Sequence, residues 1–294
     1  MAWTQPGADR ADAFLRDRIR RLFKELPRAL AGEEEPVHQV RVAGRRLRVA
    51  LPLVARKPKG GRHRRVRRAL RKLTRTAGGG RDLDVLVALY EDRVGSLDPP
   101  STVQREILRR LRAARTRSRG RMLAQVQEIR LGRLRRDLRA LRRQGPADVF
   151  TILGRARGNR EREGDALLRG LAAVGERYDP DTLHALRRRV RRLRYTSEVE
   201  DAMRGQDSGA GPVWKGLQDS IGVLHDVYVL AVWLGELAKR AASRESDAFV
   251  EATRLEGAAF EAEARRLHAE LVRSRPAETV GRALEAMARG LSAA

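Results

Sequence analysis

Residues 38–48 read His-Gln-Val-Arg-Val-Ala-Gly-Arg-Arg-Leu-Arg, and residues 184–194 read His-Ala-Leu-Arg-Arg-Arg-Val-Arg-Arg-Leu-Arg. The two segments agree at six of eleven positions, at an offset of 146 residues. A second pair follows in the same order, because residues 78–86 (GGGRDLDVL) match residues 222–230 (GVLHDVYVL) at an offset of 144. Two matches in fixed order predict an internal repeat, and hence two similar structural units in one chain.

Both copies of the first segment have the pattern of an amphipathic helix. A helix turns by about 100° per residue, so the histidine and three arginines of each copy form one narrow stripe. These stripes are His38, Arg41, Arg45 and Arg48 in the first copy, and His184, Arg187, Arg191 and Arg194 in the second. The adjoining stripes, predicted to be buried, are Val37, Val40, Ala43, Leu47 and Leu51, and Leu183, Leu186, Val190 and Leu193. A basic row at the border of a core points into a groove more readily than a row opposite the core.

Apolar residues recur at spacings of three and four through most of the chain, which indicates helices throughout and an all-α fold. The repeat predicts two helical bundles related by pseudo-twofold symmetry, over residues 1–147 and 148–294. The predicted helices span about 10–30, 36–56, 62–77, 82–95, 101–128 and 130–144 in the first half, and about 147–177, 181–203, 212–221, 226–242, 245–273 and 277–291 in the second.

The chain is strongly basic, with 63 Lys and Arg against 38 Asp and Glu and a net charge of +25. Residues 1–150 carry 39 basic and 16 acidic side chains, a net of +23, so the surplus lies in the first half. Only six of the 63 are lysines, and the arginine guanidinium binds phosphate oxygens in pairs. Further arginine rows lie on 62–77 (Arg64, Arg68, Arg71, Arg75) and 101–128, where solvated surface is the preferred interpretation. The composition indicates a polyanionic partner.

Four segments resemble the CHAD family, the histidine-containing α-helical domain. The first is Val37-His38-x-x-Arg41 through Arg48, and the second is Gly78-x-x-Arg81-Asp82 through Leu86. The third is Leu183-His184-x-x-Arg187 through Arg194, followed by Tyr195 and Glu198. The fourth is Lys215-x-Leu217-Gln218-Asp219-x-x-Gly222-x-Leu224-x-Asp226. His225 stands where the family usually has asparagine, and 212–221 lacks the arginine row of its partner at 62–77.

The resemblance implies two four-helix bundles with a basic groove or channel between them. It also implies non-catalytic binding of inorganic polyphosphate, with targeting to polyphosphate granules as a consequence. Carried over to this sequence, the polyphosphate contacts are His38, Arg41, Arg45, Arg48, His184, Arg187, Arg191, Arg194 and Lys215, supported by Arg71, Lys72, Arg75 and Arg81.

Alternatives to this interpretation remain open. A nucleic-acid-binding protein would have the same charge, although no aromatic stacking platform or groove-reading motif is evident. A phosphoryl-transfer enzyme would need acids that hold a metal, for which Asp82, Asp84 and Asp226 are the candidates. Asp82 and Asp226 are predicted first as helix N-caps and second as groups that orient a neighbouring arginine.

His38 and His184 lie near predicted helix starts, where they can donate to phosphate. No ligand spacing favours a metal site, no cofactor motif is present, and His63 and His268 are expected at the surface. Cysteine is absent, and the N-terminus lacks the pattern of a signal peptide. The longest apolar run, 227–234, is too short to span a bilayer, so we expect a cytoplasmic protein without a membrane partner.

Overall fold

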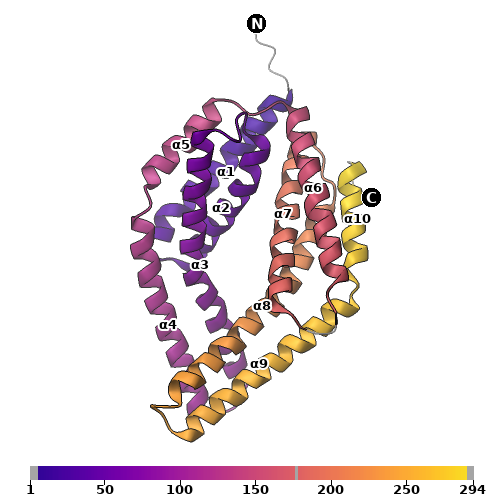
Figure 1. Cartoon of the computed structure of the whole chain (residues 1–294). Coiled ribbons are helices and arrows are strands. Elements are labelled where there is room, and N and C mark those ends of the chain that lie inside the picture. Colours follow the sequence, from indigo (N-terminus) through magenta and orange to yellow (C-terminus); the bar gives the residue numbers. More distant parts are fainter. Residues whose placement is uncertain (1–5, 176–177, 290–294) are drawn as a thin grey trace.

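The computed structural model describes residues 6–175 and 178–289, which form ten α-helices and no strand (Figure 1). The predicted all-α class is therefore confirmed for this part of the chain. The helices are α1 (Pro6–Leu30), α2 (Glu34–Val54), α3 (Gly61–Gly95), α4 (Thr102–Gln127), α5 (Leu131–Arg143), α6 (Val149–Ala172), α7 (Pro180–Arg204), α8 (Ala210–Ala241), α9 (Asp247–Arg273) and α10 (Pro276–Arg289).

Helices α3 and α8 are longer than the sequence pattern predicts, because two expected breaks are absent. The glycine run at 78–80 and Gly222 were expected to end helices, but α3 and α8 continue through them. Of the described glycines at these two places, Gly78, Gly79 and Gly222, none has a positive φ angle. In α3, the Ser118 hydroxyl of α4 donates to the carbonyl oxygen of Gly79 at 3.1 Å. Packing against neighbouring helices therefore outweighs the low helix propensity of glycine here.

Three hydrophobic clusters hold the helices together. The first is built around Leu47 and joins α1, α2, α5, the first half of α3 and the end of α4, and it also includes residues of α6 and α7 from the second half. The second is built around Trp214 and joins α6, α7, α10 and the first half of α8. The third contains Tyr90 and Leu234 and is shared between the two halves of the chain, since it joins the ends of α3 and α8 to α4 and α9. In Figure 1 these last four helices meet at the bottom of the molecule.

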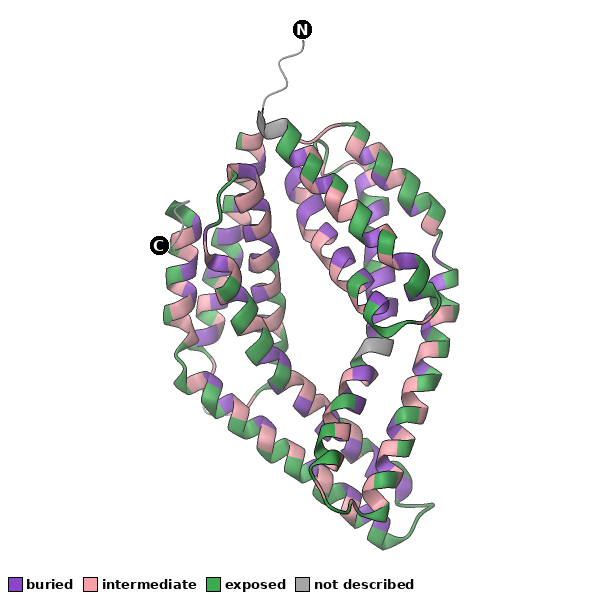
Figure 2. Ribbon diagram, turned by 180° about the vertical axis from the view of Figure 1, so that it is seen from behind, coloured by how far each residue is buried: buried purple, intermediate pink, exposed green. Residues whose placement is uncertain are grey.

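The apolar stripes predicted for the repeated motif are buried in both copies. Val37, Val40, Ala43, Leu47 and Leu51 lie in the first cluster, and Leu183, Leu186, Val190 and Leu193 lie in the second. In Figure 2 buried and exposed positions alternate along the helices, as expected for amphipathic helices packed on one side. The burial of these stripes fixes the rotation of α2 and α7, and with it the direction of their arginine rows.

Helix α8 is long and apolar enough to cross a membrane by composition, with a mean hydropathy of 1.5 over its most apolar 18 residues. Half of that window is buried inside the fold. Its residues from Ala210 to Val227 pack into the second cluster, and those from Leu230 to Ala241 pack into the third. Core packing therefore accounts for the apolar character of α8.

Candidate functional site

Five arginines from the two motif segments lie near one another where α2 contacts α7. Arg45 of α2 is close enough to Arg187 and Arg191 of α7 for their charges to interact. Arg191 interacts in turn with Arg41 and Arg48 of α2. We call these five residues the arginine cluster. The two basic rows, far apart in sequence, thus approach each other from opposite halves of the chain.

The arginine cluster is electrostatically strained. Burial, followed by repulsion from Arg41 and Arg191, lowers the pKa of Arg45 to about 9. Burial, with repulsion from Arg187 and Arg41, lowers the pKa of Arg191 to about 10. Among the described residues, the ion pairs of the cluster belong to Arg41 and Arg187 alone. The other members therefore hold positive charge without a neighbouring carboxylate, which is the condition that favours a bound anion.

In each half, one arginine of the cluster lies beside a glycine and an aspartate of another helix, and these two residues are four positions apart in the sequence. Nη1 of Arg41 lies 2.8 Å from Oδ1 of Asp82 and 3.3 Å from the carbonyl oxygen of Gly78. Nη1 of Arg187 lies 3.6 Å from Oδ1 of Asp226.

The glycine leaves room for each guanidinium group. A Cβ atom at position 78 would lie 3.6 Å from Cζ of Arg41, and one at position 222 would lie 3.4 Å from Nη2 of Arg187. Both aspartates lie inside a continuous helix, so the N-cap prediction was wrong, and each aspartate instead pairs with an arginine, as the alternative required.

Two histidines lie beside the cluster. The rings of His184 in α7 and His225 in α8 have centroids 5.5 Å apart. Burial and the charges of Arg187 and His184 lower the pKa of His225 to about 4, while Asp82 opposes this shift. Asp82 belongs to the first half and His225 to the second, so these side chains also meet across the repeat. From the sequence, His225 was singled out only as a departure from the family pattern, and its place beside the cluster was not predicted.

His38 and His184 occupy equivalent places in their helices. Because α2 begins at Glu34 and α7 at Pro180, each histidine is the fifth helical residue. His38 is half-buried and His184 is exposed. Two other histidines were placed wrongly: His63 and His268 are buried, not at the surface, and the His268 ring packs edge-on against Tyr178 at 5.5 Å.

Tyr195 and Glu198, at the end of the third motif, fasten α7 to the first half. Oε1 of Glu198 lies 3.0 Å from Nη2 of Arg46 in α2, and Oε2 lies 2.9 Å from Nη2 of Arg18 in α1. The guanidinium of Arg46 also lies over the Tyr195 ring, 5.6 Å from its centroid. Arg46 therefore joins the two halves, whereas Arg45 beside it remains without a carboxylate partner among the described residues.

The supporting residues predicted from the sequence fall in different places. Arg71 is near enough to Arg48 to contribute to its lowered pKa, after burial, and Nη1 of Arg48 donates to the Thr74 hydroxyl at 3.3 Å. Nη1 of Arg194 lies 3.5 Å from Oε1 of Gln218 in α8. The side chain of Arg81 lies outside the described part of the structure.

Three predicted residues have contacts elsewhere. Nζ of Lys72 lies 3.1 Å from Oε2 of Glu128, and Lys72 and Arg75 line a groove between α3 and α4. Nζ of Lys215 lies 2.7 Å from Oδ2 of Asp219 within α8. The arginine row on α4 is largely paired with acids, as expected for surface: Arg109 with Glu106, Arg112 with Glu91, and Arg115 and Arg119 with Glu34.

The candidate catalytic acids are each paired with an arginine. Asp82 pairs with Arg41, Asp226 with Arg187, and Asp84 with Arg119 at 3.0 Å. Among the described residues, no group of three His, Asp or Glu side chains could hold a metal ion. The site is thus an array of arginines of which, among the described residues, only Arg41 and Arg187 pair with a carboxylate, and its chemistry is suited to binding anions.

The strain in the cluster predicts a pH-dependent stability effect. The folded pKa of Arg45, about 9, lies below its ordinary value of 12.5, so the unfolded chain binds more protons between these values. The charged guanidinium therefore destabilises the folded protein below pH 9, and this cost is relieved as pH rises. We expect Arg45→Met to raise the unfolding free energy of the ligand-free protein by roughly 1–2 kcal/mol at pH 8. Chemical denaturation at pH 8 and pH 10.5 measures this, and the advantage should shrink at the higher pH. A variant that is less stable at both values would contradict the prediction.

Comparisons with known proteins agree with this architecture. The family model described as “CHAD domain” matches residues 13–235. The crystal structure of the CHAD domain from the plant Ricinus communis has a TM-score of 0.63 and 21% sequence identity, and the alignment covers 95% of this chain and 91% of that chain. PptA from Streptomyces chartreusis has a TM-score of 0.60 and 16% identity, covering 97% of this chain and all (100%) of that chain. The comparison with curated proteins found no match.

At these identities the two structures show a shared fold, whereas the family match spans well over half of the sequence. The four motifs that carried the resemblance lie on α2, α3, α7 and α8. In the folded chain α2 and α8 each contact both α3 and α7. The chain therefore belongs to the CHAD domain family.

Proposed function

We propose that this protein binds inorganic polyphosphate, without catalysing a reaction, through the arginine cluster between α2 and α7. The observation that carries the proposal is the position of Arg45 and Arg191. They come from opposite halves of the chain and are both partly buried. Burial, together with repulsion from other arginines of the cluster, lowers the pKa of each. A folded protein keeps such charges together at a cost in stability, and a polyanion between them offsets that cost.

Polyphosphate suits this arrangement for chemical reasons. It carries about one charge per phosphate along an unbranched chain, so several guanidinium groups can each bind a different phosphate. The planar guanidinium donates two parallel hydrogen bonds to phosphate oxygens, and Asp82 and Asp226 orient two of the groups that would do so. His184 and His225 would gain protons beside the bound anion, since a neighbouring negative charge raises a histidine pKa.

The proposed contacts are the five arginines of the cluster, together with His184 and Arg71, which interact with its members, and with His38 and Arg194 on the same helices. Lys72, Arg75 and Lys215 are less favoured, because Lys72 and Lys215 pair with carboxylates and Lys72 and Arg75 line another groove. Binding of this kind would recruit a cytoplasmic protein to polyphosphate granules. The CHAD resemblance implies the same ligand.

Titration with labelled polyphosphate over a range of salt concentrations tests the proposal. Because binding releases counterions, we expect affinity to fall on the order of a thousandfold between about 50 and 200 mM salt if some six phosphates are neutralised. Orthophosphate and pyrophosphate at equal phosphate concentration should compete weakly, since neither spans the two helices. Equal competition by orthophosphate would contradict binding of a chain.

A further inference from the structure

A cationic groove separate from the arginine cluster lies in the first half, between α1 and α5. It has a volume of about 490 Å³, a size that holds a drug-sized ligand. We call it the α1–α5 groove. Figure 1 shows α5 at the outer edge of the first half, away from α7, and none of the residues that line the groove belongs to the arginine cluster.

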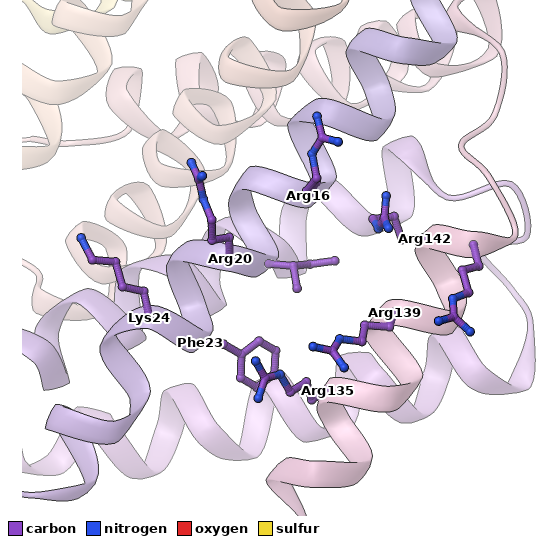
Figure 3. A pocket seen from close by; sticks show the side chains of 9 residues that line it. Arg16, Arg20, Phe23, Lys24, Arg135, Arg139 and Arg142 are labelled. Atoms are coloured by element: carbon purple, nitrogen blue, oxygen red, sulfur yellow. The ribbon is translucent and has the colours of Figure 1, made fainter. Parts of the chain in front are cut away.

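The walls of this groove carry only positive side chains. Arg16, Arg20 and Lys24 line it from α1, and Arg135, Arg139 and Arg143 line it from α5 (Figure 3). All six are exposed. Arg20 pairs with Asp17, and Arg142, at the same wall, pairs with Asp12. Among the described residues, no ion pair is formed by the remaining five, which are Arg16, Lys24, Arg135, Arg139 and Arg143. The groove therefore has a large surplus of positive charge.

The floor of the groove is apolar and includes an aromatic ring. Ile19 and Phe23 of α1 both line the groove. Figure 3 shows the Phe23 ring between the two basic walls. The guanidinium of Arg135 lies over the Phe23 ring, 5.2 Å from its centroid. A stacked guanidinium and phenyl group present a flat surface on which a nucleobase can stack. An apolar, aromatic floor offers no favourable contact to polyphosphate, because polyphosphate is charged along its whole length.

The spacing of the cations also favours one ligand. Arg16, Arg20 and Lys24 follow each other at intervals of four residues, as do Arg135, Arg139 and Arg143. Successive members of each row are therefore about 6 Å apart along the helix axis. Neighbouring phosphates of polyphosphate share a bridging oxygen and lie closer than this. In a nucleic acid a sugar separates the phosphates, which brings their spacing nearer to that of the rows.

We propose that the α1–α5 groove binds single-stranded nucleic acid. One base stacks on the surface formed by Phe23 and Arg135, and the flanking phosphates bind the arginines and Lys24 along the two walls. This combination of a basic track and a stacking surface is how proteins bind single strands without reading their sequence. The proposal does not depend on polyphosphate binding at the arginine cluster, because the two sites share no residue.

The test uses the full chain with Arg45→Glu and Arg191→Glu, so that the arginine cluster cannot contribute. A short labelled DNA single strand is titrated at low salt, first against this protein and then with Arg139→Gln and Arg143→Gln added. We expect the added pair to weaken binding about tenfold. The matched control is Arg133→Gln with Arg136→Gln, two exposed arginines of α5 outside the groove, and it should change affinity by less than about twofold. Equal losses in both pairs would overturn the proposal.

Base stacking is tested separately with Phe23→Leu, which keeps an apolar side chain in the floor. It should weaken binding of the normal strand by at least about fivefold and leave binding of an abasic strand of the same length unchanged. Should this variant fail to fold, the abasic strand alone decides, since it must bind the unaltered groove more weakly than the normal strand. Equal binding of abasic strand, duplex DNA or polyphosphate at matched phosphate concentration would mean a general polyanion surface and would overturn the proposal.

Discussion

Replacing Arg45 and Arg191 together by glutamate should weaken polyphosphate binding by more than a hundredfold. Each substitution removes a charge-assisted hydrogen bond, worth about 1.5–3 kcal/mol. It also puts a carboxylate where phosphate would lie, and the two effects together exceed the roughly 2.7 kcal/mol that correspond to a hundredfold change. Titration with labelled polyphosphate at fixed salt measures the loss. A change of less than about threefold would mean that the cluster does not bind the ligand.

The control for this experiment has the same change in charge but leaves the cluster intact. Arg136 in α5 and Arg240 in α8 are exposed and, like the tested pair, come one from each half. Arg136→Glu with Arg240→Glu should weaken binding only by the small long-range effect of net charge. The Arg45→Glu, Arg191→Glu protein should also remain folded, because each new carboxylate lies near Arg41 or Arg187 and relieves their repulsion. Retained helicity by circular dichroism separates lost binding from lost folding.

The positions of the motif helices could be predicted from the sequence because local pattern determines them. The apolar residues of 38–51 recur with the helical period, so burying them fixes the direction of Arg41 and Arg45 without knowledge of the rest of the fold. The repeat predicted that the second copy would behave alike, and Leu186 and Val190 are indeed buried beside Arg187 and Arg191.

The features that were missed depend on contacts between distant segments. The continuity of α3 through Gly78–Gly80 depends on packing by α4, which propensity does not report. His225 lies beside the cluster only because α8 continues past Gly222 and brings the residue to His184. Phe23 gave no sequence signal as a stacking surface, because the arginine that covers it comes from a helix more than 100 residues away along the chain.

The largest loss of stability from a single substitution is expected at Arg160, which belongs to neither candidate binding site. Nη1 of Arg160 donates to Oε1 and Oε2 of Glu200 at 2.6 and 2.7 Å, and both side chains are buried in the second half. Arg160→Met leaves the Glu200 carboxylate buried without its main partner. Breaking a buried pair in this way costs about 3–5 kcal/mol, and Arg204 nearby limits the loss to the lower end. On the same helix, Arg157→Met breaks only the exposed Arg157–Glu161 pair and should leave the unfolding free energy almost unchanged.

The cause of the loss can be separated from a simple packing defect by changing pH and by a second substitution. Burial raises the pKa of Glu200 above 4.5, and Arg160 opposes that shift. Without Arg160 the folded protein binds more protons than the unfolded chain between 4.5 and the raised value, so its stability increases as pH falls through this window. The unfolding free energy lost in Arg160→Met should therefore be smaller at pH 5.5 than at pH 8. Adding Glu200→Leu should recover most of it, because no buried charge then remains unpaired. A loss that is the same at both pH values and persists in the double variant would instead indicate a cavity left by the arginine side chain.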